Sequence, residues 1–341
     1  MIPVLYSLSG PRLSDAEAAF FRSVRPAGFI LFRRNVGTGD ELRALTDSLK
    51  DLMGRRDIPI LIDQEGGRVQ RMAPPHWPAY PAMGLFGAVD RYDPALARRA
   101  LGLTVAALAE DLRRAGITVN CLPLLDVVHP GADNVIGDRA FGDDPDRVAR
   151  LGRVVVDALL AGGVLPVVKH VPGHGRATLD SHESLPVVTA PESSLKAVDF
   201  RPFRALGDAP FAMTAHVAYT ALDGRRPATL SRAIIGRVIR MWMGFGGLLM
   251  SDDLSMKALT GPMGARAVAA LAAGCDLALH CNGDMAEMEA IAAAVPEAPA
   301  SLGRALDGAM ARARTPAAPV DRAALDAALE ACHGLLAEKE T

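Results

Sequence analysis

The sequence has no surplus of positive charge. Its 37 lysines and arginines are offset by 39 aspartates and glutamates, which gives a formal net charge of −2 at neutral pH. Binding to nucleic acid requires basic side chains that neutralise phosphates, so this balance argues against a nucleic-acid partner. Arginines alternate with acidic residues along the segments of helical character, as on solvated helix faces.

Cysteine is scarce, and its spacing is uninformative. The four cysteines show no CxxC pairs and stand mostly in apolar surroundings: Cys121, Cys275, Cys281 and Cys332. A disulfide framework is therefore not expected, and reduced, buried thiols are typical of a cytoplasmic protein.

Long apolar runs are missing as well. No stretch of about 18 apolar residues occurs, so no membrane span is predicted. Residues 1–10 lack a basic region, and their apolar run is too short for a signal peptide. We expect a cytoplasmic monomer without a membrane partner. The glycine signatures of nucleotide-binding open sheets, GxGxxG and the Walker motif, are also absent.

The sequence does contain a series of short apolar segments of strand length. Their nearly continuous apolar character is what parallel strands buried on both faces require. The segments are 2–8, 28–32, 58–63, 118–126, 164–170, 211–216, 247–253 and 276–281.

Helical segments separate these strands, and their starts carry capping signals. Ser14 and Thr38 each stand three residues before a glutamate, and Asp93 and Asp144 each precede a proline. The regular alternation predicts an α/β fold, a (β/α)8 TIM-type barrel, with a doubly wound open sheet as the alternative. We expect a single domain over 1–341, with the C-terminal helices, about 302–338, packed on the outside of the barrel.

Polar residues follow the predicted strands at one end only. In a barrel, the C-terminal strand ends carry the chemistry. An active site is predicted there, and a structural ion-pair network is the alternative. The residues are Asp63, Gln64, Glu65, Asp126, Lys169, His170, His216, Asp252, Asp253 and Asn282.

The loop after the fifth strand, 169–188, is rich in histidine. A metal site is disfavoured, because His170 and His174 are separated by Pro172-Gly173 and cationic side chains would repel a metal ion. A phosphate site would need a helix starting at the glycines, and no clear helix start occurs there. Proton transfer is left as the hypothesis, since Asp180 stands two residues before His182 and can orient its ring.

Four motifs, taken together, resemble the family 3 glycoside hydrolases. They are the 169–175 segment with Asp180-Ser181-His182, and the segments 62–72, 136–145 and 247–256. The nearest resemblance is to the single-domain β-N-acetylglucosaminidases of bacterial cell-wall recycling. It extends over nearly the whole chain.

The resemblance implies a retaining hydrolase that removes terminal N-acetyl-β-D-glucosamine from peptidoglycan fragments. Asp252 would be the nucleophile, and His182, held by Asp180, the acid/base. A histidine suits this role because its reference pKa of about 6.5 lies near neutrality. The resemblance implies neither a metal nor another cofactor. The sugar hydroxyls would be bound by Asp63, Arg71, Arg139, Lys169 and His170.

Four other functions stay open at this point. Substrate-assisted cleavage would use the pair Asp252-Asp253, although successive strand residues point to opposite faces, so only one is expected to face the pocket. Phosphorolysis is the second, and a catalytically idle muropeptide-binding protein is the third. A metal-dependent amidohydrolase is the fourth.

Overall fold

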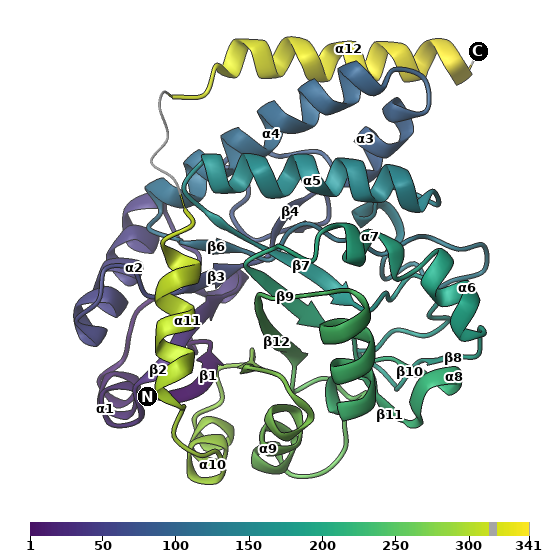
Figure 1. Cartoon of the computed structure of the whole chain (residues 1–341). Helices are drawn as coiled ribbons and strands as arrows, with labels where there is room; N and C mark the ends of the chain where they lie inside the picture. Colours follow the sequence, from purple (N-terminus) through teal and green to yellow (C-terminus); the bar gives the residue numbers. More distant parts are fainter. Residues whose placement is uncertain (314–318, 341) are drawn as a thin grey trace.

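The centre of the computed structural model, which describes residues 1–313 and 319–340, is a closed barrel of eight parallel strands (Figure 1). The order around the barrel is β1-β13-β12-β9-β7-β6-β3-β2. This arrangement confirms the predicted barrel and excludes the open sheet. The strands are β1 (Ile2–Tyr6), β2 (Pro26–Leu31), β3 (Ile60–Ile62), β6 (Val119–Asn120), β7 (Leu165–Val171), β9 (Phe211–Thr214), β12 (Leu248–Asp253) and β13 (Leu277–His280).

The strands are apolar on both faces because each face meets its own apolar layer. Leu5 of β1 belongs to the cluster inside the barrel, and its neighbours Val4 and Tyr6 belong to the layer under the helices. Successive side chains of a strand point to opposite faces, so the continuous apolar run fills both layers.

Helices surround the barrel and begin where the capping signals predicted. The side chains of Ser14 and Thr38 form complete capping boxes, and Asp93 and Asp144 cap helices that begin at a proline. The helices are α1 (Asp15–Val24), α2 (Gly39–Met53), α3 (Met83–Asp90), α4 (Pro94–Arg114), α5 (Pro145–Ala161), α6 (Glu192–Ala197), α7 (Arg201–Ala205), α8 (Thr220–Asp223), a π-helical segment (Ile234–Trp242), α9 (Met263–Ala273), α10 (Met285–Ala294), α11 (Ala300–Met310) and α12 (Arg322–Glu340). None of the described helices is long and apolar enough to cross a membrane.

The predicted strand 118–126 is regular only at its start. Pro123 has no N–H group to donate to a ladder, so β6 ends before it. The segment nevertheless continues beside β7, because the N–H of Lys169 donates to the carbonyl of Pro123 and the N–H of Leu125 donates to the carbonyl of Lys169. This path brings Asp126 to the C-terminal end of the barrel.

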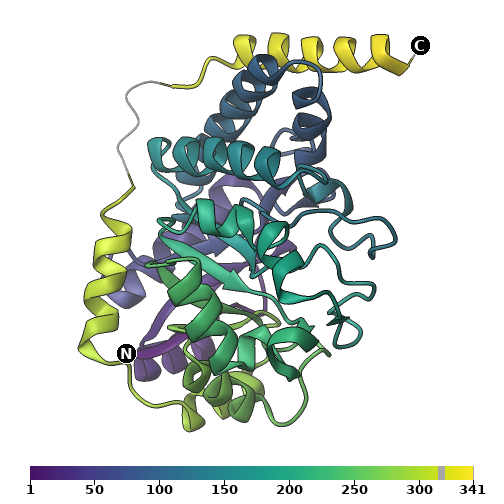
Figure 2. The ribbon, with the colours of Figure 1, turned by 45° about the vertical axis from the view of Figure 1, so that its right-hand side comes forward.

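The two C-terminal helices occupy different places (Figures 1 and 2). Helix α11 covers the N-terminal opening of the barrel, where Leu302 and Leu306 join the interior cluster. Helix α12 instead packs on α4 and α3, and Arg322 at its start contacts Asp111 of α4 at 2.7 Å. That the whole chain forms one domain stays a prediction.

Short strands in the loops build the C-terminal rim. The hairpin β4 (Gln64–Gly66) and β5 (Val69–Gln70) follows β3 directly, and a small sheet contains β8 (Val187–Val188), β10 (Ala218–Tyr219) and β11 (Gly224–Pro227). The hairpin turns through Gly66 and Gly67, both with positive φ, and a Cβ at Gly66 would collide with the carbonyl oxygen of Pro81. These glycines therefore allow the tight turn that carries Arg68.

Candidate active site

A cavity of about 420 Å³ opens at the C-terminal ends of the strands. Strands β2, β7, β9, β12 and β13 contribute to its lining, together with the loops that follow β3, β6 and β7. The eight residues that the resemblance implicates all line it: Asp63, Arg71, Arg139, Lys169, His170, Asp180, His182 and Asp252. Residues scattered over the sequence are thus brought to one place.

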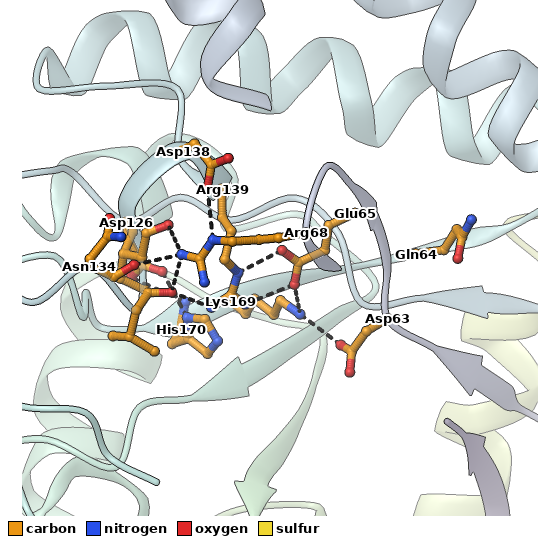
Figure 3. Close-up of polar contacts among 12 residues, drawn as sticks. Asp63, Gln64, Glu65, Arg68, Asp126, Asn134, Asp138, Arg139, Lys169 and His170 are labelled. Atoms are coloured by element: carbon orange, nitrogen blue, oxygen red, sulfur yellow. Dashed lines mark hydrogen bonds and ion pairs between the residues drawn. The ribbon is translucent and has the colours of Figure 1, made fainter. Parts of the chain in front are cut away.

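An ion-pair network lies along this cavity (Figure 3), and all of its members except Glu65 line the cavity. Glu65 accepts two hydrogen bonds from Arg139, both of 2.8 Å, and its carboxylate lies 2.6 Å from Nζ of Lys169. Lys169 also donates to Asp63 at 2.8 Å, and Arg71 contacts the second oxygen of Asp63 at 3.1 Å. Two carboxylates and three cations therefore hold one another in defined orientations.

The charges of this network stabilise one another against burial. Burial alone would raise the pKa of Asp63 and of Glu65. Lys169 and the neighbouring arginine, Arg71 at Asp63 and Arg139 at Glu65, together outweigh burial, so both pKa values fall below their usual range. Burial likewise opposes the charge of Lys169 and of Arg139, yet the neighbouring carboxylates raise both pKa values. The four groups are ionised at neutral pH.

Asp126 holds the two histidines that follow β7. Its Oδ2 accepts the Nδ1–H of His170 at 2.8 Å, and its Oδ1 accepts the backbone N–H of His174 at 2.6 Å. Burial would raise the pKa of Asp126, but the charge and hydrogen bond of His170 lower it. With Nδ1 bonded to Asp126, Nε2 is the nitrogen of His170 that is left for a ligand.

The acidic pair at the end of β12 differs from the expectation, because both Asp252 and Asp253 line the cavity. The register between β12 and β13 shifts between Met250 and Asp253, and such an irregularity breaks the strict alternation of side chains. The two carboxylates nevertheless have different partners. Asp253 accepts hydrogen bonds from Ser255 and from the backbone N–H of Cys281. It therefore connects the loop that follows β12 with the end of β13.

Asp252 is bonded more sparsely than Asp253. Its Oδ1 accepts the backbone N–H of Asp253 at 2.8 Å. Burial would raise its pKa, but His216, His170, the backbone N–H of Asp253 and Lys169 together outweigh burial and lower it. Asp252 is therefore an ionised carboxylate at the cavity, which is the state that a nucleophile needs.

Asp180 and His182 form the pair that their spacing predicts. The Nδ1–H of His182 donates to Oδ1 of Asp180 at 2.7 Å, and the same oxygen accepts the backbone N–H of His182. Burial would raise the pKa of Asp180, but these hydrogen bonds lower it. The His182 side chain is 65 % exposed at the mouth of the cavity.

Three residues of the site had no assigned role in the sequence. Glu65 and Asp126 stood out at strand ends, but their partners are distant in the chain. Arg68 lies in the 62–72 motif without a role of its own. It donates from Nη2 to the carbonyl groups of residues 134–136 and from Nε to Asp138 (Figure 3). These bonds join the β4–β5 hairpin to the loop that carries Arg139.

The site defines a class of protein. An ionised carboxylate and an oriented histidine share a polar cavity at the C-terminal rim of a barrel, and this combination serves nucleophilic and acid–base chemistry.

Comparison with known proteins identifies the family within this class. The family described as the glycosyl hydrolase family 3 N terminal domain matches residues 4–312. The chain belongs to this family and is a glycoside hydrolase. It is 43 % identical to a beta-hexosaminidase of Alkalilimnicola ehrlichii over 284 residues. The aligned region covers 82 % of this chain and 80 % of that protein.

Solved structures resemble most of the chain. NagZ from Neisseria gonorrhoeae, in complex with N-trifluoroacetyl-D-glucosamine, has a TM-score of 0.78 and 31 % identity, over 92 % of this chain and 98 % of that one. A glycoside hydrolase family 3 beta-N-acetylglucosaminidase from Paenibacillus sp. str. FPU-7 has a TM-score of 0.81 and 30 % identity. The match covers 94 % of this chain but only 63 % of the longer Paenibacillus protein.

Proposed function

We propose that this glycoside hydrolase is a retaining β-N-acetylhexosaminidase. Its substrates would be peptidoglycan fragments (GlcNAc-anhydroMurNAc-peptides), from which it removes terminal N-acetyl-β-D-glucosamine during peptidoglycan recycling. One observation carries the proposal: the ionised Asp252 and the His182–Asp180 pair line the same cavity. The similar beta-hexosaminidase and the NagZ complex with an N-acylated glucosamine support this choice of sugar.

The proposed reaction has two steps. In the first, a carboxylate oxygen of Asp252 attacks the anomeric carbon, the glycosidic bond breaks, and the leaving oxygen takes the Nε2 proton of His182. In the second step, Nε2 of His182, which has given up its proton, takes a proton from a water molecule. The water oxygen bonds to the anomeric carbon, and the bond between that carbon and Asp252 breaks. Asp180 holds Nδ1 throughout, which directs Nε2 to the reacting oxygen.

The ion-pair network would hold the sugar. Two of the three N–H groups of Lys169 bond to Asp63 and Glu65, which leaves one for a sugar hydroxyl. The carboxylate oxygens of Asp63 each retain accepting capacity beside Lys169 and Arg71. Nε2 of His170 and the guanidinium groups of Arg71 and Arg139 complete the proposed binding set, because all line the cavity.

Replacement of Asp252 by asparagine tests the nucleophile. The change keeps the shape of the side chain and removes the attacking charge, so turnover should fall by several orders of magnitude. The wild-type enzyme, incubated with a 2-fluoro or 5-fluoro sugar, should form a covalent adduct that fragmentation mass spectrometry locates on Asp252.

Two results would contradict this assignment. An adduct on Asp253 would move the nucleophile to the neighbouring residue. The absence of an adduct, together with tight inhibition by a thiazoline, would favour substrate-assisted cleavage by the acidic pair.

A further inference from the structure

The acid/base loop contains one residue that is buried between two more exposed neighbours. Ser181 is 3 % exposed, whereas the side chains of Asp180 and His182 are 31 % and 65 % exposed. The loop therefore presents its acid–base pair outward on both sides of an inward-pointing residue. A small polar side chain at such a position must find a partner inside the protein.

Ser181 has partners on two separate segments. Its hydroxyl lies 3.2 Å from Nε2 of His174, and its backbone carbonyl accepts the N–H of Ala258 at 3.2 Å. Ala258 stands in the loop that follows β12, the strand that carries Asp252. Ser181 thus connects the acid/base loop with His174 on one side and, on the other, with the loop that follows the strand of the proposed nucleophile, Asp252.

His174 is itself firmly placed. It is 3 % exposed, its backbone N–H donates to the buried carboxylate of Asp126, and its ring packs edge-on against His170. Burial lowers the pKa of His174 to about 4, so the ring is neutral at neutral pH. Among the described residues its Nδ1 has no hydrogen-bond partner, so the bond to Ser181 is the only one that its ring makes there.

We propose that the Ser181–His174 hydrogen bond is a latch that positions the His182–Asp180 pair over the cavity. The latch extends from Asp126 at the barrel rim, through His174, to the backbone between the two members of the pair. Ser181 and His174 are positioning residues here, since they act through His182. The inference rests on the proposed acid/base role of His182.

The test compares two substrates in wild type and Ser181→Ala. Loss of one hydrogen bond should lower kcat/KM about fivefold for a disaccharide, whose leaving oxygen needs a proton, and change it by less than about twofold for a dinitrophenyl glycoside, whose leaving group needs none. Ser184→Ala, in the same loop, is the matched control and should leave both values unchanged. Equal losses on both substrates in Ser181→Ala would overturn the positioning role.

A second pair of variants shows whether the effect passes through the latch. His174→Phe keeps a ring and removes the polar nitrogen, whereas His174→Gln places an amide near the position of Nε2 and should restore most of the disaccharide activity. The effects of Ser181→Ala and His174→Phe should not add in the double variant, because both remove the same bond. Additive losses would contradict the latch.

Hydrogen–deuterium exchange separates this inference from the proposed function. The amides of His182 and Glu183 bond to Asp180, and in Ser181→Ala they should exchange about fivefold faster than in wild type or Ser184→Ala. Unchanged exchange would refute the latch. Faster exchange, together with a His182→Ala variant that loses activity equally on both substrates, would retain the latch and refute the acid/base role of His182.

Discussion

Replacement of Glu65 by glutamine should destabilise the protein far more than an ordinary surface change. Glu65 is 1 % exposed and is the carboxylate partner of Arg139, whose side chain is 11 % exposed, and a second partner of the buried Lys169. Removal of one member of a buried ion pair costs about 3–5 kcal/mol, because an uncompensated charge stays behind. Glutamine keeps one accepting oxygen, so we expect about 3 kcal/mol, at the lower end of that range.

The measurement is urea unfolding of both proteins, with the midpoint and the slope compared. Asp138→Asn is the matched control. Asp138 pairs with Arg68 between the same two loops, but the two side chains are 55 % and 43 % exposed, so its loss should cost less than about 1 kcal/mol. Equal, small costs for the two variants would refute the view that the buried network supports the fold.

The effect should also depend on pH in a defined direction. The folded-state pKa of Glu65 lies below its unfolded value, because Lys169 and Arg139 outweigh burial. Its stabilising contribution is therefore complete above the unfolded pKa, about 4.3, and disappears as the pH falls through the folded value. The stability difference between wild type and Glu65→Gln should be constant near neutral pH and shrink below about pH 4. A difference that grows on acidification would contradict the assigned charge state.

Three further outcomes follow from the site. His182→Ala should cripple cleavage of a disaccharide and cost much less in the glycosylation step of a dinitrophenyl glycoside; equal losses would assign His182 to binding or folding. Asp180→Asn should show a weaker form of this pattern, because the imidazole stays but loses its orienting charge, and a loss larger than that of His182→Ala would contradict the pairing. EDTA should leave turnover of an aryl β-N-acetylglucosaminide unchanged, since the described residues contain no cluster of three or more His, Cys, Asp or Glu side chains that could hold a metal ion. Activity lost with EDTA and recovered with zinc would favour the amidohydrolase, and a sugar phosphate formed in phosphate buffer would favour phosphorolysis.

The sequence predicted the barrel because its signals are local. A strand buried on both faces must be apolar throughout, so each of the eight strands left a readable run. The helix starts were readable for the same reason: Ser14 and Thr38 bond to backbone groups three residues away. The early end of β6, before Pro123, was also visible in principle, because proline lacks the donor that a ladder needs.

The parts that escaped prediction depend on distant residues. Arg68 binds carbonyl groups about 66 to 68 positions away in the chain, and main-chain acceptors leave no mark on the sequence. The direction of the Asp253 side chain was wrongly predicted for a different reason. It depends on the register of β12 against β13. One irregularity in that register breaks the strict alternation of side chains on which the prediction was based.

From the sequence, an ion-pair network and an active site were alternative interpretations of the polar rim. In the structure the two are compatible, because the ion pairs lie beside the cavity. Lys169 bonds to Asp63 and Glu65 and also lines the cavity, so one side chain belongs to both. Under the proposed function Lys169 binds a neutral sugar in a set geometry, and such a group benefits from partners that hold it in place before the ligand arrives. On this argument, Glu65 stabilises the fold and orients Lys169 at once, so substitutions there should impair stability and sugar binding together.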